Sequence, residues 1–117
     1  MAVPLDGFRA VPLWSDGRAT VVVSGEIDYV TAPCLREALD DCLARRPWRI
    51  DVDFGAVTFC DISGLNALLG ARRKARAAGV RLHVINVRES LVAMLFRRVQ
   101  AEDLIAPGAL RVDRLAD

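Results

Sequence analysis

Apolar residues at the start of the chain follow the short, β-branched pattern of strands. Residues 8–13 include Pro12, which cannot donate to a sheet ladder, so they predict an edge strand. Residues 15–18 form a turn around a glycine. Residues 19–24 are rich in β-branched side chains and predict a second strand, paired with the first as a hairpin. Residues 25–30 are expected to form a loop.

The middle of the chain switches between helical and strand patterns. Thr31 occupies a helix N-cap position, and Pro33 follows in the first turn, where a missing N–H costs nothing. Apolar residues then recur at helical spacing until the chain reaches Pro47. Residues 48–54 alternate between apolar and polar, which predicts a strand with one apolar face. Residues 55–59 are expected to turn the chain.

Two helices and one strand are predicted in the second half. One helix begins near Ser63 and ends at Gly79, and its basic stretch, residues 72–76, is interpreted as a solvated face. Residues 81–86 predict a strand, and residues 89–99 predict a third helix. The apolar face of that helix is formed by Leu91, Val92, Leu95, Phe96 and Val99.

The order of these elements predicts an α/β fold. Helices that alternate with strands after an opening hairpin imply a mixed, mostly parallel four-stranded sheet, packed with three to four helices. With no repeat and no linker, residues 1–117 are expected to form a single domain. Its core is predicted to span about residues 8–106, with a polar tail after Leu110.

Composition narrows the classes of function. The 117 residues are 53% hydrophobic and 26% charged, which excludes a disordered chain. A net charge of +1 disfavours a dedicated nucleic-acid binder, and no apolar run approaches the ~20 residues that span a membrane. The first six residues lack the pattern of a signal peptide, and three cysteines without C-x-x-C spacing suit neither a disulfide framework nor zinc. A cytoplasmic protein without a metal is expected.

Candidate chemistry lies in two loops that precede helices. Ser63 has two interpretations, an N-cap or a hydroxyl that a kinase phosphorylates. Asp28 and Asp61 either fix their loops or present charge to a partner, and Glu26 is solvated or bonded to its loop. Cys60 is interpreted as a small buried hydrophobe rather than a redox sensor. No phosphate-binding glycine loop occurs and no histidine lies near Ser63, so an enzyme is disfavoured.

Two motifs in this element order resemble the STAS domain family. They are Val22-Val-Ser-Gly-Glu-Ile-Asp28, continued by Thr31-Ala-Pro-x-Leu35, and Phe59-x-Asp-x-Ser-Gly-Leu65. The chain is similar in particular to stand-alone anti-anti-sigma factors. The resemblance implies a cytoplasmic protein that binds an anti-sigma factor, typically a serine kinase, and so releases a sigma factor. ATP and Mg²⁺ would belong to that kinase. The implied partner surface comprises Glu26, Asp28, Asp61, Ile62, Ser63 and Gly64.

Two positions depart from the family pattern. The family places a phosphorylated hydroxyl residue directly after the aspartate of the second motif, where this chain has Ile62. Three outcomes stay open: Ser63 is the acceptor, the protein binds without phosphoregulation, or it serves as an adaptor in a signalling or transport complex. The family usually has a glycine directly after the third helix, where this chain has Gln100. A ligand-sensing domain and a hydrolase using Ser63 are weaker alternatives, and no pattern names the sigma factor, the stimulus or the oligomeric state.

Overall fold

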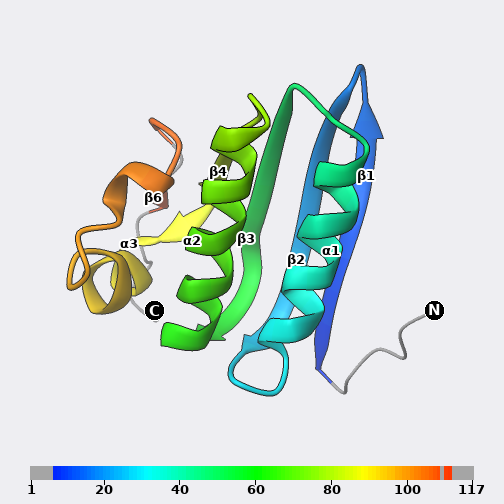
Figure 1. Ribbon diagram of the computed structural model, residues 1–117. Helices are drawn as coiled ribbons and strands as arrows, with labels where there is room; N and C mark the ends of the chain where they lie inside the picture. The colour runs from blue at the N-terminus through cyan, green and yellow to red at the C-terminus, as the bar shows by residue number, and fades with distance from the viewer. Residues whose placement is uncertain (1–6, 109, 112–117) are drawn as a thin grey trace.

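Four strands form the central sheet in the order β1-β2-β3-β4 (Figure 1). They are β1 (Phe8–Ser15), β2 (Arg18–Ile27), β3 (Arg49–Cys60) and β4 (Arg81–Ile85). In this computed structural model, which describes residues 7–108 and 110–111, β1 is antiparallel to β2, whereas β2, β3 and β4 run parallel. The predicted mixed sheet with an opening hairpin is confirmed.

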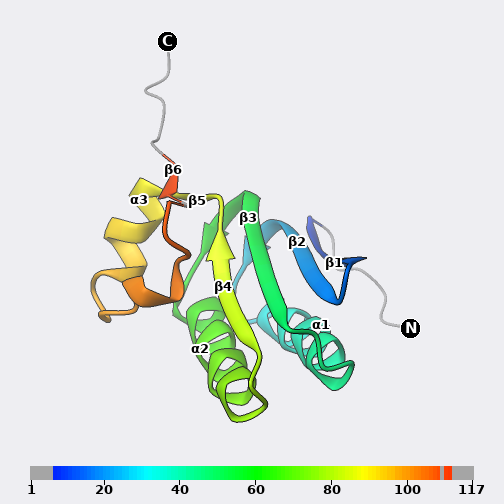
Figure 2. The ribbon, with the colours of Figure 1, turned by 90° about the horizontal axis from the view of Figure 1, so that it is seen from above.

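The helices α1 (Ala32–Ala44) and α2 (Ile62–Ala77) cover one face of this sheet (Figure 2). After β4 the chain continues through the two-residue strand β5 (Val87–Arg88), α3 (Glu89–Leu91) and the π-helical turn η1 (Val92–Phe96). It then forms a 3₁₀ turn, η2 (Glu102–Leu104), and the two-residue strand β6 (Leu110–Arg111), which pairs with β5. This last part packs beside β4, away from the hairpin.

The core lies between the sheet and the two helices. Alternating residues of β2 and β3 point into it, and apolar stripes of both helices face them. Its largest fully buried side chains include Phe54, Phe96, Ile27, Leu35, Leu39, Ile50, Leu65 and Leu68. Each side chain of this size stabilises the fold by about 1.5–3 kcal/mol when it leaves water. The predicted helical stripe of α1 is confirmed by its buried Leu35, Leu39 and Cys42.

The hairpin and the α2 terminus follow their predicted chemistry. Asp16 and Gly17 form the two-residue turn with positive φ angles of 53° and 75°. Pro12 lies in β1, which has a sheet neighbour on one side only, as expected for an edge strand. Gly79 follows Ala78, the C-cap of α2, and takes a φ of 73°. The next amide, of Val80, donates to the Ala75 carbonyl.

The loop predicted at residues 25–30 begins as strand, and the turn predicted at residues 55–59 lies wholly within a strand. β2 continues to Ile27 and β3 to Cys60, so the two predicted boundaries were wrong. The register shifts between Val22 and Ser24 and again between Gly25 and Glu26, and each shift gives β3 one extra residue. Such bulges bend a strand without ending it. The glycines that suggested turns therefore mark curvature.

The third helix is shorter than predicted. α3 passes at once into the π-helical turn, which ends at Phe96 rather than continuing to Val99. Val92, Leu95 and Phe96 are buried as expected, whereas Val99 is 43% exposed. Gln100 then takes a φ of 55°, a conformation that favours glycine. The predicted polar tail after Leu110 lies largely outside the described residues.

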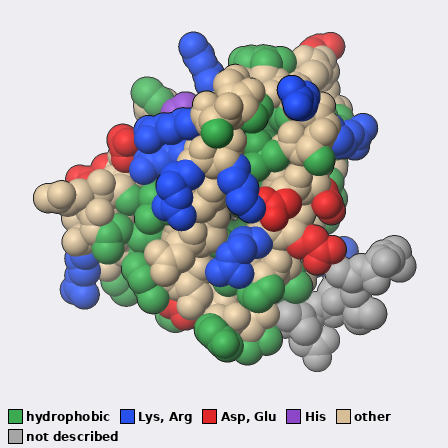
Figure 3. Space-filling view, in the orientation of Figure 1, with side chains coloured by type: hydrophobic (Ala, Val, Ile, Leu, Met, Phe, Trp, Pro, Cys, Tyr) green, Lys and Arg blue, Asp and Glu red, His purple; other side chains and the backbone are tan. Residues whose placement is uncertain are grey.

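Charges divide between the two covering helices. Basic side chains run along α2 and acidic side chains lie over α1 (Figure 3). The basic stretch of α2 was predicted to be a solvated face, but two of its residues form ion pairs. Arg72 Nη1 lies 2.9 Å from Asp103 Oδ1, and Lys74 Nζ lies 2.9 Å from Asp40 Oδ1. The Lys74–Asp40 pair is exposed, and an exposed pair contributes about 0–1 kcal/mol. The two pairs join α2 to α1 and to the η2 segment.

Candidate functional site

The two candidate loops meet at the carboxyl edge of the parallel strands. β2 and β3 end side by side, with Ile27 paired to Cys60. The amide of Asp61 donates to the Ile27 carbonyl at 3.1 Å, which ties the start of the second loop to the end of β2. In parallel sheets this edge is where loops and helix N-termini gather. The structure therefore brings the two sequence motifs together.

The loop between β2 and α1 is held by Asp28 and Thr31. The Asp28 carboxylate accepts hydrogen bonds from the amides of Val30 and Thr31 at 2.9 and 3.0 Å. The Thr31 hydroxyl accepts from the Asp28 amide and donates to the Glu26 carbonyl, both at 2.9 Å. Asp28 thus fixes its own loop, which is one of its two predicted roles. Asp28 is half-buried.

Thr31 is the N-cap residue of α1, but its hydroxyl does not cap the helix. The side chain is buried and turned back toward Glu26 and Asp28. Pro33 lies in the first turn as predicted. The hydrogen bonds of Thr31 therefore tie the start of the helix to the loop before it.

Asp61, not Ser63, is the N-cap of α2. Its carboxylate accepts from the amides of Ser63 at 2.8 Å and Gly64 at 3.4 Å. The interpretation of Ser63 as the N-cap is therefore wrong, because the helix begins at Ile62 and Ser63 already lies in its first turn. An aspartate satisfies the free amides and also complements the positive end of the helix dipole. Ser63 is half-buried.

Gly64 and Cys60 set how closely α2 approaches the sheet. Gly64 is buried, and a Cβ atom there would lie 2.6 Å from both the Cys60 Sγ and the Ile27 Cγ2. Only glycine permits this approach. Burial, reinforced by the neighbouring Asp61 charge, raises the pKa of Cys60 to about 12. A thiol that stays protonated and buried is inert, as predicted for Cys60.

Four exposed apolar side chains surround these loops. Tyr29, Val30 and Phe59 were not among the residues predicted to bind a partner, although Phe59 begins the second motif. Tyr29 is 82% exposed and Val30 63%, next to Asp28, while Phe59 and Ile62 flank Asp61. Because Phe59 pairs with Glu26 across the strands, both loops contribute to one surface. We call Glu26, Asp28, Tyr29, Val30, Phe59, Asp61 and Ile62 the carboxyl-edge surface. The isolated Tyr-Val pair in a polar loop was the sequence feature that could have indicated it.

The one histidine of the chain lies on a different strand from these two loops. His83 lies on β4 opposite Asp51 of β3, and burial together with the Arg49 charge lowers its pKa. The described residues contain no cluster of metal-ligating side chains. Within the same residues, no helix is both long and apolar enough to cross a bilayer. Rigid loops, exposed apolar groups and carboxylates instead suit the binding of a protein.

Comparison with known proteins connects this geometry to a family. The family model described as "Mlab, STAS domain" matches residues 13–106. The anti-sigma-F factor antagonist RsfB of Mycobacterium tuberculosis strain H37Rv is 36% identical over 59 residues. That match covers 50% of this chain and 48% of the relative, so it spans about half the length of each.

Two solved structures share the architecture over most of the chain. An anti-sigma factor antagonist from Mycobacterium paratuberculosis gives a TM-score of 0.76 at 26% identity, covering 92% of this chain and 89% of that chain. The Bacillus cell fate determinant SpoIIAA in its phosphorylated form gives 0.65 at 17% identity, covering 92% and 91%. The second likeness is one of fold alone.

Proposed function

The chain belongs to the STAS domain family, and we propose that within this family it is an anti-sigma factor antagonist that works in the cytoplasm. The observation that carries the proposal is the carboxyl-edge surface, built from the two motifs that the family resemblance rests on. The similarity to the mycobacterial antagonist over 92% of the chain supports it. ATP and Mg²⁺ are expected in the partner kinase and not in this chain.

The carboxyl-edge surface has the features of a preformed protein-binding site. Tyr29 offers a large aromatic group at 82% exposure, and tyrosine is enriched among the residues that dominate binding energy. The hydrogen bonds of Asp28 and Asp61 already fix both loops. A partner therefore loses little free energy to loop ordering when it binds. The half-buried carboxylates suit a basic group on the anti-sigma factor.

Phosphate control at this site is restricted to one residue. Ile62, at the first position of α2, has no hydroxyl, so Ser63 is the one hydroxyl residue in this turn. Its amide is already bonded to the Asp61 carboxylate. A phosphate on Ser63 would add about 1.5–2 negative charges next to that carboxylate. Repulsion would disturb the helix end and the surface around it, which would terminate binding.

Titration calorimetry with the purified anti-sigma factors of the source organism tests the proposal. Ile62→Asp places a charge among the apolar groups of the carboxyl-edge surface, whereas Leu13→Asp makes the same change on the edge strand β1. The two side chains are matched in exposure, at 49% and 56%. We expect one anti-sigma factor to bind, Ile62→Asp to weaken it at least tenfold, and Leu13→Asp to leave it unchanged. Failure of every anti-sigma factor to bind would contradict the proposal.

A second function is favoured by Ile62 itself. An exposed isoleucine at the family's acceptor position suits an adaptor that binds constitutively, without a kinase. Phosphopeptide mapping after incubation with host lysate, Mg²⁺ and ATP separates the two. Phosphate on Ser63 supports a partner switch. No phosphate on this chain, while a related antagonist is labelled in the same lysate, supports the adaptor.

A further inference from the structure

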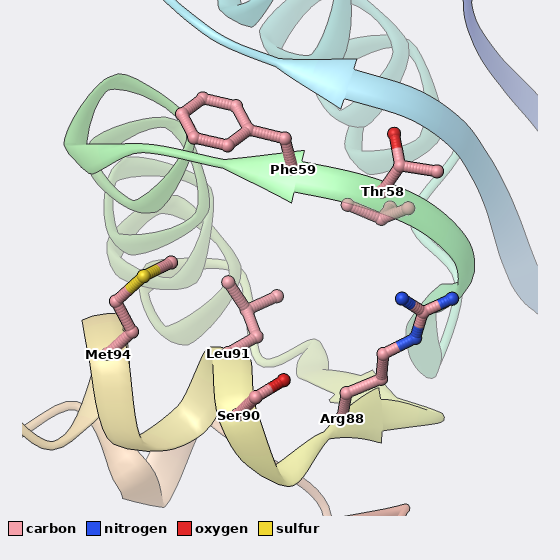
Figure 4. A pocket seen from close by; sticks show the side chains of 7 residues that line it. Thr58, Phe59, Arg88, Ser90, Leu91 and Met94 are labelled. Carbon is pink, nitrogen blue, oxygen red and sulfur yellow. The ribbon is translucent and has the colours of Figure 1, made fainter. Parts of the chain in front are cut away.

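A small groove lies between the end of β3 and the third helix (Figure 4). Its volume is about 180 Å³. Most of its walls are apolar side chains, from Val57, Phe59, Leu91 and Met94. Its polar lining residues are Thr58, Ser90 and Arg88, and the guanidinium of Arg88 extends toward β3. An apolar hollow with one cation at its rim is suited to an amphipathic occupant.

Two irregularities of the backbone form this groove. The extra residue that the second bulge adds to β3 lies at Thr58, in the groove wall. On the other side, the π-helical turn contains Met94, which it leaves 50% exposed while Val92 and Leu95 are buried. π-helical turns and bulges occur frequently at functional sites. Here both open toward the same hollow.

The volume of the groove limits the size of the group that can fill it. Small-molecule and cofactor sites enclose about 300–1,000 Å³, well above the size of this groove. At roughly 30 Å³ for each water, it corresponds to about six water molecules. That space matches one leucine or phenylalanine side chain better than a nucleotide. A side chain delivered by a peptide segment therefore fits the groove best.

The positive charge of Arg88 at the rim of the groove favours an acidic residue near that apolar side chain. Arg88 is exposed, and no ion pair joins it to another of the described residues. A guanidinium is suited to a carboxylate, which it binds with two parallel hydrogen bonds. Phe59 belongs both to the groove and to the carboxyl-edge surface, so the two regions are continuous.

We propose that this groove docks an acidic amphipathic segment of a partner protein, which inserts one large apolar side chain between Phe59 and Met94 and pairs an aspartate or glutamate with Arg88. The inference extends the proposed function by adding a second contact region beside the carboxyl-edge surface. It also names the chemistry of the partner segment that binds there.

Peptide selection tests the groove without any anti-sigma factor. A random dodecapeptide library is displayed on phage and selected on the full chain, and enriched peptides are labelled with fluorescein and titrated by anisotropy. We expect a shared pattern of one large apolar residue with an acidic residue three or four positions away. Met94→Asp and Arg88→Glu should each weaken binding at least tenfold, and both positions are exposed enough to leave folding unchanged.

A charge swap distinguishes a direct pair from a general effect of charge. Changing the acidic residue of the peptide to lysine should restore binding to Arg88→Glu and abolish binding to the unchanged protein. Leu13→Asp and Arg18→Glu, on the hairpin, serve as matched controls and should bind normally. Absence of the pattern, or full binding to Met94→Asp and Arg88→Glu, would overturn the proposal. Peptides lost only with Ile62→Asp would assign binding to the carboxyl-edge surface and leave the proposed function intact.

Discussion

Replacing Gly64 with alanine tests how closely α2 approaches the sheet. A control substitution elsewhere in the helix separates this effect from the higher helix propensity of alanine. In Gly64→Ala, the new Cβ would lie 2.6 Å from both the Cys60 Sγ and the Ile27 Cγ2, atoms of two side chains at most 1% exposed. One of the two buried side chains, or the helix itself, must therefore shift. Gly70→Ala is the matched control in the same helix, because its Cβ would lie 3.7 Å from Arg73 Nη2, the end of a flexible side chain.

The two substitutions should change stability in opposite directions. Overpacking a buried site costs about 1–3 kcal/mol, while alanine gains up to ~1 kcal/mol over glycine in a helix. Even with the full gain in helix propensity, Gly64→Ala should therefore lose up to about 2 kcal/mol net, which lowers the midpoint of thermal unfolding by up to roughly 8 °C for a domain of this size. Gly70→Ala should be as stable as the unchanged protein or up to ~1 kcal/mol more stable.

Thermal and urea unfolding followed by circular dichroism measure both effects. Cys60→Ala removes one of the two clashing atoms, so combining it with Gly64→Ala should recover part of the loss beyond additivity. If Gly64→Ala is as stable as Gly70→Ala, the close approach of α2 to Ile27 and Cys60 is refuted. The geometry of the carboxyl-edge surface would then need another explanation.

Four further predictions follow from individual contacts. Asp61→Ala should lose about 1 kcal/mol of unfolding free energy by removing the cap of α2, and Asp61→Asn, which keeps an acceptor, should lose less; urea unfolding measures both, and equal losses would refute a capping role. Titration of the native protein with Ellman's reagent should modify Cys34 first, because Cys42 and Cys60 are buried and burial raises the pKa of both thiols; early labelling of Cys60 would contradict this. Burial and the Arg49 charge lower the pKa of His83, so as pH falls the unfolded state binds a proton at this histidine before the folded state does. The free energy of unfolding should therefore fall as pH decreases below about 6.5. His83→Asn should reduce the dependence of this free energy on pH between about pH 7.5 and 5.5, and an unchanged dependence would refute the prediction. Gln100→Gly should raise the unfolding midpoint by relieving a positive φ, a gain of roughly 0.5–1 kcal/mol, whereas a lower midpoint would show that φ is not strained.

The element order was predictable because it rests on local patterns. Alternation in residues 48–54 and the helical stripe of α1 depend on near neighbours along the chain. The ends of β2 and β3 could not be predicted in this way. Gly25 and Gly55 favour a turn in the local sequence whether they end a strand or bend it. Only pairing with the neighbouring strand decides between these outcomes.

Only the part of the site that depends on local sequence could be predicted. Its carboxylates lie in recognisable motifs before helices, but which residue caps α2 depends on where the helix begins. Asp61 takes that role because the helix starts at Ile62, two residues earlier than an N-cap at Ser63 would require. Exposure of Tyr29 and the groove beside Met94 result from tertiary packing, which residue spacing does not encode.

Release of a sigma factor is the most direct test of the central claim. A transcription reaction contains RNA polymerase, its sigma factor and the anti-sigma factor that binds this chain in calorimetry, so that transcription is repressed. We predict that adding the protein restores transcript in proportion to its concentration, that Leu13→Asp does the same, and that Ile62→Asp does not. Transcription that stays repressed at a large excess of the unchanged protein would contradict the account.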